Sequence, residues 1–166
     1  MIDILAVLVA LGASAPAPRS SLLRAPIIVE AQAPGTLTDV ERYVRAALTA
    51  PGGQSILVIH VSAPGDFVQL TGEAGAAQFS FPLVTPRQRS DEDSLRTVLA
   101  ELHLSVHESP GSNGMRFLDV AAGSDVHRVA SVTRTLLRRL HGVTAKTPLE
   151  FECQGCGTPG ARAPGR

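Results

Sequence analysis

The chain has no tryptophan, one tyrosine and five phenylalanines, so aromatic residues make up only 4% of its 166 residues. Hydrophobic residues still reach 44%, which predicts a core of ordinary size built mainly from aliphatic side chains. The formal net charge is zero, which argues against general attraction to nucleic acid or to an anionic membrane. The length suits one domain with tails.

Cysteine is also scarce, with only Cys153 and Cys156 present, fewer than a chain that depends on disulfides usually carries. Their CxxC spacing suits half of a metal site or a thiol–disulfide pair. A structural zinc site needs four ligands, and without a second CxxC it would have to recruit histidines. The candidates are His103, His107, His127 and His141. We favour an incidental or locally oxidised pair, then metal, then redox function, because the motif lies in a Gly-rich tail.

Motifs of catalysis are missing as well. The sequence contains no GxSxG nucleophile motif and no glycine-rich phosphate loop. We therefore expect no enzyme activity, no catalytic residue and no cofactor. The arginines of the segment 126–141 predict a solvated helix face, and they lack the interleaved aromatic residues that stack nucleic-acid bases.

Long hydrophobic runs are absent, and the longest near the start is Ile4–Ala13. It falls well short of the roughly 20 apolar residues of a membrane-spanning helix. Ala13-Ser14-Ala15 resembles a signal-peptide cleavage site, but no basic residue precedes the run and Pro16 follows it. We expect a cytoplasmic protein, with a secreted or envelope-associated one as the alternative if residues 1–15 act as a leader.

Local patterns predict the elements of the central part. A helix is expected from Thr38, where Thr38 and Glu41 have capping-box spacing, to the breaker at residues 51–53. Alternating or continuous apolar runs then predict three strands, a polar loop at 85–89, a helix, a hairpin and a last helix. The expected strands span 56–61, 67–71, 78–83, 104–108 and 115–120. The last two helices are expected to start at the caps Ser90 and Ser124, and the last one to end at Gly142.

These elements predict an α+β fold with an antiparallel sheet of about five strands, in the order α-β-β-β-α-β-β-α. This domain is expected over residues 36–145. Residues 1–35 are interpreted as an apolar leader and a Pro/Ala/Ser-rich linker with one β-like run, Ile27–Val29. Residues 146–166 are interpreted as a flexible tail that carries the CxxC, with one further strand suggested at 148–152.

The element order and the segment Gly65-Asp66-Phe67-Val68-Gln69-Leu70 resemble the type III secretion chaperone-like, YbjN-like domains of actinobacteria. The end of the last helix, Leu136–Val143, is similar to the end of those domains. The resemblance covers about residues 37–143. It implies a domain without enzyme activity, commonly dimeric, that offers apolar surface to an extended protein segment.

The sequence thus favours a chaperone-like domain that holds a partner polypeptide and forms a possible homodimer, without nucleic acid. The alternative is a small secreted or envelope-associated domain with a C-terminal CxxC metal or redox site. The strand residues predicted to form much of the core, and with it the partner surface, are Phe67, Val68, Leu70, Phe79 and Phe81. The second helix is predicted to form the dimer contact, through Leu95, Val98, Leu99 and Leu102.

Overall fold

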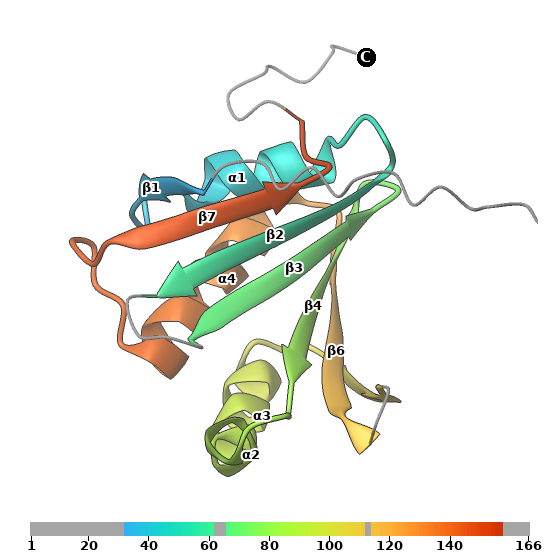
Figure 1. Cartoon of the computed structure of the whole chain (residues 1–166), viewed down its shortest axis with the longest axis vertical. Helices are drawn as coiled ribbons and strands as arrows, with labels where there is room; N and C mark the ends of the chain where they lie inside the picture. Colours follow the sequence, from blue (N-terminus) through green and yellow to red (C-terminus); the bar gives the residue numbers. More distant parts are fainter. Residues whose placement is uncertain (1–31, 62–65, 112–113, 158–166) are drawn as a thin grey trace, which may run out of the picture.

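The computed structural model describes residues 32–61, 66–111 and 114–157, in which one antiparallel sheet of seven strands faces a layer of four helices (Figure 1). The strands are β1 (Ala33–Gly35), β2 (Gln54–Val61), β3 (Phe67–Glu73), β4 (Ala76–Pro82), β5 (Val106–Pro110), β6 (Arg116–Gly123) and β7 (Leu149–Gln154). The helices are α1 (Val40–Leu48), α2 (Pro86–Ser90), α3 (Glu92–Glu101) and α4 (Val126–His141). The strand order is β1-β7-β2-β3-β4-β6-β5.

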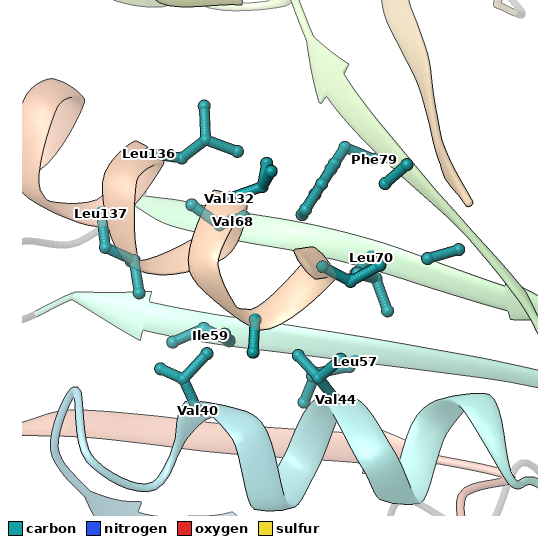
Figure 2. Packing of buried hydrophobic residues seen from close by; sticks show 14 of the residues in the cluster. Val40, Val44, Leu57, Ile59, Val68, Leu70, Phe79, Val132, Leu136 and Leu137 are labelled. Carbon is teal, nitrogen blue, oxygen red and sulfur yellow. The ribbon is translucent and has the colours of Figure 1, made fainter. Parts of the chain in front are cut away.

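The core lies between the sheet and the helices. Every second residue of the inner strands is buried, as in Leu57 and Ile59 of β2 or Val68 and Leu70 of β3, which is the alternation of a sheet with one covered face. Figure 2 shows these side chains meeting Val40 and Val44 of α1 and Val132, Leu136 and Leu137 of α4. The core is thus built mainly from aliphatic side chains, as the scarcity of aromatic residues predicts.

The expected α+β class is confirmed, and so are two of its parts. β2, β3 and β4 form the predicted antiparallel meander, and β5 and β6 form the predicted hairpin. The predicted number of about five strands and the predicted element order are not matched exactly, because β1 and α2 are additional and the further strand suggested at 148–152 is present as β7 and joins the sheet. The β-like run Ile27–Val29 lies outside the described residues.

Helix α1 begins one residue later than predicted. Asp39 is the residue before its first turn, and its carboxylate accepts a hydrogen bond from the backbone nitrogen of Thr36 at 2.9 Å instead of capping the helix. The expected capping box of Thr38 and Glu41 is therefore wrong. A carboxylate oxygen of Glu41 instead lies 3.1 Å from a guanidinium nitrogen of Arg45, on the next turn of the helix.

The polar loop predicted at 85–89 is a short helix, α2. Thr85 and Gln88 form a complete capping box, and Pro86 occupies the first turn. Proline is favoured there because its missing N–H would have no intrahelical partner. The sequence Thr-Pro-x-Gln has the same capping-box spacing that was used to predict a helix start at Thr38, and it therefore predicts this helix start as well.

Helices α3 and α4 occupy the predicted segments, but both predicted caps are one residue early. Asp91, not Ser90, precedes α3, and Asp125, not Ser124, caps α4 by accepting a hydrogen bond from the backbone nitrogen of Arg128 at 2.7 Å. Gly142 ends α4 in the left-handed conformation, with φ of 64°, as predicted from its position.

The C-terminal strand β7 is the largest departure from the sequence analysis. It lies inside the sheet, between β1 and β2, although the domain was expected to end at residue 145. Leu149 and Phe151 are 1% exposed, so the strand contributes to the core. The structured domain therefore reaches at least Gly157, whose backbone nitrogen donates to the carbonyl of Ala46 in α1.

Candidate functional site

The face of the sheet that points away from the helices is the candidate functional surface, and we call it the open face. In the described part of the chain, α1, α3 and α4 contribute buried residues to the core on the opposite face, whereas α2 has no buried residue (Figure 1). The side chains of the open face are therefore partly exposed where those of the other face are buried. Antiparallel sheets commonly leave one such face free for solvent or a partner.

Cross-strand pairing gathers residues from six strands into one line across this face. We call this line the cross-face row. Its members, in sheet order, are Glu152 (β7), Val58 (β2), Gln69 (β3), Ser80 (β4), Asp119 (β6) and His107 (β5). An acidic residue thus lies near each end, with small or amide side chains between them.

At the β6 end of the row, Asp119 is held by two hydroxyl groups. Ser80 donates to one carboxylate oxygen at 2.7 Å and Ser109 donates to the other at 2.5 Å. Neutral donors orient the carboxylate but leave its charge uncompensated. The carboxylate of Asp119 could therefore accept a further hydrogen bond from a cationic group while it keeps the hydrogen bonds from the two serines.

At the β7 end, Glu152 lies against His60 and Gln154. Its carboxylate is 3.2 Å from the Nε2 atom of His60 and accepts from the amide of Gln154 at 3.1 Å. The pKa of Glu152 is lowered from its ordinary value of 4.5, first by the hydrogen bond from Gln154 and then by those from His60 and Gln32. Glu152 is therefore ionised at neutral pH.

Apolar side chains complete the open face. Ile56 and Val58 of β2 are partly exposed, and Phe67 and Phe117 lie on β3 and β6. The ring centroid of Phe67 is 6.3 Å from that of His60 in a tilted arrangement. The face therefore offers hydrogen-bond acceptors, carboxylates and partly exposed apolar side chains together.

Most of the residues predicted to contact a partner lie in the core instead. Val68, Leu70, Phe79, Phe81, Leu95 and Leu99 are each at most 7% exposed. The expectation that the meander residues form much of the core is met by Val68, Leu70, Phe79 and Phe81. Phe67, on the opposite face of β3, and Leu102, after α3, are only partly buried.

The predicted dimer helix has its apolar side covered within the chain. Leu95, Val98 and Leu99 of α3 are all buried, and Leu102 packs against the same cluster. The exposed side of α3 is charged, with Arg96 bound to Glu92 at 2.7 Å. No apolar stripe of α3 is thus left for a second copy among the described residues.

The two cysteines form a disulfide at the end of β7. Cys153 and Cys156 are 5% and 9% exposed, with Cα atoms 5.8 Å apart. This is the locally oxidised alternative of the sequence analysis, and it places the motif on a buried strand end rather than in a flexible tail. Sulfur atoms bonded to each other do not coordinate a metal ion.

The histidines named as further ligands lie apart from one another, and the two that share α4, His127 and His141, are at its opposite ends. His127 of α4 is 3.0 Å from Glu41 of α1, His107 is on β5, and His103 follows α3. Burial lowers the pKa of His141, which ends α4. Within residues 32–61, 66–111 and 114–157, no group of three or more His, Cys, Asp or Glu side chains is arranged to hold a metal ion.

Two of the basic residues of α4, Arg134 and Arg139, make structural contacts. Arg134 donates to the backbone carbonyl of Leu37 at 3.2 Å and approaches Glu41, and Arg139 lies 3.0 Å from Glu101 of α3. These contacts support the expected reading of a solvated helix face with local ion pairs. They bind α4 to α1 and α3.

The residues that the sequence analysis missed are the polar ones at the centre of the open face. Ser80, Ser109 and Asp119 were not singled out, although Asp119 stands between two buried residues of β6, Leu118 and Val120. That alternation marks Asp119 as facing away from the core. The strand order that brings Ser80, Ser109 and Asp119 together could not be predicted from the sequence.

The structure defines the class of this protein as an α+β domain with one antiparallel sheet covered by helices on one face. Comparisons with models of protein families, with curated proteins and with solved structures found no match. Among the described helices, none is long and apolar enough to cross a membrane.

Proposed function

We propose that this protein is a non-enzymatic, chaperone-like domain that holds a partner polypeptide without a cofactor. The observation that carries the proposal is the open face, where Phe67, Ile56 and Val58 are left partly exposed by a helix layer that packs entirely on the other side. An uncovered sheet face that presents apolar side chains together with hydrogen-bonding ones suits the docking of a polypeptide. The resemblance to secretion chaperone-like domains supports the same function.

The edges of the sheet differ in their capacity to pair with a partner strand. β1 is only three residues long and contains Pro34, which cannot donate a backbone hydrogen bond. β5 is five residues long, with its proline only at the last position. We therefore assign any partner strand that joins the sheet to β5, next to the Asp119 end of the open face.

The test is affinity capture of partners from the native cell by the full chain, followed by mass spectrometry. We expect one reproducible protein partner, lost in Phe67→Ser and retained in Val84→Ser. Val84 is a matched control because it is apolar and 42% exposed but lies outside the strands. Equal capture by both variants would contradict the role of the open face, and an activity that depends on a small molecule would overturn the proposal.

Self-association is part of the same proposal and is tested separately. A homodimer would have to use the open face or the edge of β5, because the apolar side of α3 is buried. Light scattering at tens of micromolar would report it. A strict monomer that still captures a partner would remove the dimer and leave the partner-binding function in place.

The second candidate is a secreted or envelope-associated domain, and the Cys153–Cys156 disulfide favours it. Disulfides persist in oxidising compartments and are rare in the cytoplasm, the location that the lead proposal assumes. N-terminal sequencing of the mature protein separates the two. A removed leader excludes a cytoplasmic chaperone, and an intact N-terminus with reduced thiols excludes the secreted alternative.

A further inference from the structure

The described strands are almost free of positive charge. Across β1 to β7, the only lysine or arginine is Arg116. Its guanidinium lies 2.6 Å from Glu108 and 3.3 Å from Glu92, which places it on the side of α3 and away from the open face. The open face therefore contains no lysine or arginine among the residues of these strands.

Carboxylates, by contrast, are present on this face. By strand alternation and register, the open face carries Glu73, Asp119, Glu150 and Glu152. The acidic residues that pair with arginine in the described chain are Asp39, Glu41, Asp66, Asp91, Glu92, Glu101 and Glu108. Among the described residues, none of the four open-face carboxylates is in that set. Glu152 lies 3.2 Å from the Nε2 atom of His60, and the other three have no ion pair with a described residue, so the described part of the face has an excess of carboxylates over lysine and arginine.

From this charge pattern we infer that the partner of the open face is an extended polypeptide segment with basic side chains, lying across the strands along the cross-face row. This inference rests on the proposed protein-binding function and specifies the chemistry of the partner. Its basic residues meet Glu152 at one end and Asp119 at the other. Its apolar or small residues lie over Val58 and Ser80 between them.

The register fixes the spacing of those basic residues. Glu152 and Asp119 are separated by four inter-strand steps, from β7 through β2, β3 and β4 to β6. At about 4.8 Å per step this is about 19 Å, which an extended chain covers in about six residues. Side chains six residues apart also point to the same side of an extended chain, because they alternate with a period of two. A pair of basic residues at i and i+6 therefore matches both carboxylates.

The probe for the test is the synthetic peptide Arg-Ser-Val-Ser-Val-Ser-Arg, titrated into the isotope-labelled full chain and followed by amide chemical shifts. Two control peptides are matched to it. Glu-Ser-Val-Ser-Val-Ser-Glu reverses the charge, and Arg-Ser-Val-Arg-Ser-Val-Ser keeps the charge but sends the two arginines to opposite sides. We expect shifts on Val58, Gln69, Ser80 and Asp119 with the first peptide and weaker binding of both controls.

Protein variants locate the contact. Glu152→Gln and Asp119→Asn should each weaken binding of the first peptide about threefold, the scale of one exposed ion pair. Asp93→Asn is the control, because Asp93 is an exposed carboxylate of α3 on the helix side. In Asp119→Asn, one serine hydroxyl can still donate to the amide oxygen, and the other can accept a hydrogen bond from the amide nitrogen, so the variant should fold. Unchanged spectra elsewhere check this.

Three results would overturn the inference. The first is equal binding of the spacing control, or equal weakening by Asp93→Asn, which would mean unspecific attraction. The second is no shift on the open face at millimolar peptide. The third is open-face shifts that depend on protein concentration alone, which would make the face a contact between copies. If a native partner is captured through Phe67 but lacks this sensitivity to charge and spacing, the proposed function stands and this inference fails.

Discussion

Tyr43 of α1 and Phe151 of β7 stack with their ring centroids 4.2 Å apart and their planes within 9° of parallel. Both rings are buried, at 5% and 1% exposure, in a chain with few aromatic residues. The pair binds the first described helix to the last strand. It therefore makes the C-terminal segment part of the cooperative domain rather than an appendage.

The first prediction follows from that pair. Phe151→Ala should lower the free energy of unfolding by about 3–5 kcal/mol, the usual cost of truncating a buried phenylalanine. Urea denaturation followed by circular dichroism measures it. Lys146→Ala, an exposed change just before β7, is the control and should leave the midpoint nearly unchanged. A stability of Phe151→Ala equal to that of the wild type would mean that β7 is dispensable.

The second prediction concerns the close approach of β3 to α1 at Gly72. A Cβ atom at Gly72 would lie 2.6 Å from the Oγ atom of Ser55 and 2.8 Å from the backbone carbonyl oxygen of Ala47. Gly72→Ala should therefore cost about 1–3 kcal/mol of stability, as overpacking does. Gly52→Ala is the matched control, because a Cβ atom there meets nothing within 4 Å. Equal thermal midpoints of the two variants would refute the close contact.

The third prediction uses the four-charge cluster of Glu92, Arg96, Glu108 and Arg116. The pKa of Glu108 is lowered from its ordinary value of 4.5, first by the hydrogen bond from Arg116 and then by the charges of Arg116 and Arg96. A carboxyl with a lowered folded pKa stabilises the fold above its unfolded pKa, and this stabilisation is lost as the pH falls through the folded value.

Glu108→Gln should therefore be less stable than the wild type at neutral pH, and the difference should shrink as the pH falls below the ordinary glutamate pKa of 4.5. Urea midpoints measured across that range give the comparison. Asp93→Asn, on the same helix as Glu92 but outside the cluster, controls for the loss of a negative charge. A difference that is constant with pH would exclude the ionic origin.

The fourth prediction concerns the disulfide. Intact-mass measurement of the purified protein should find no free thiol, and reduction should add two hydrogen atoms and expose Cys153 and Cys156 to alkylation. For so short a loop, chain entropy gives a stabilisation of about 2 kcal/mol. Reductant should thus lower the urea midpoint of the wild type but leave Cys153→Ala/Cys156→Ala unchanged. A wild-type protein insensitive to reductant would contradict this.

Elements marked by strong local patterns were predictable from the sequence. The apolar face of α1, with Val40 and Val44, was identified because its spacing repeats with the helical period. α2 was missed although Thr85 and Gln88 gave its capping box, because the segment has no apolar residue to show a helical period. Exposed short helices depend on their caps, and only the cap rule could have found this one.

The candidate site was predictable only in part. Alternation alone placed Phe67 and Gln69 on one face of β3 and Val68 and Leu70 on the other, as the structure has them. The alternation of side chains along a strand does not indicate which face of the sheet the helices cover. It therefore could not separate core residues from residues of a partner surface. The buried Phe79 was assigned to both for this reason.

The sequence by itself determined the meander, the hairpin, the amphipathic helices and the end of α4 at Gly142, because each depends on interactions between near neighbours in the chain. The tertiary structure alone decided that β7 inserts between β1 and β2 and that the cross-face row runs from Glu152 to Asp119. Strand order is set by which distant segments bury their apolar faces together, and no local pattern encodes that choice. The same long-range pairing gathers the open-face carboxylates where no described arginine pairs with them, and so it creates the candidate site.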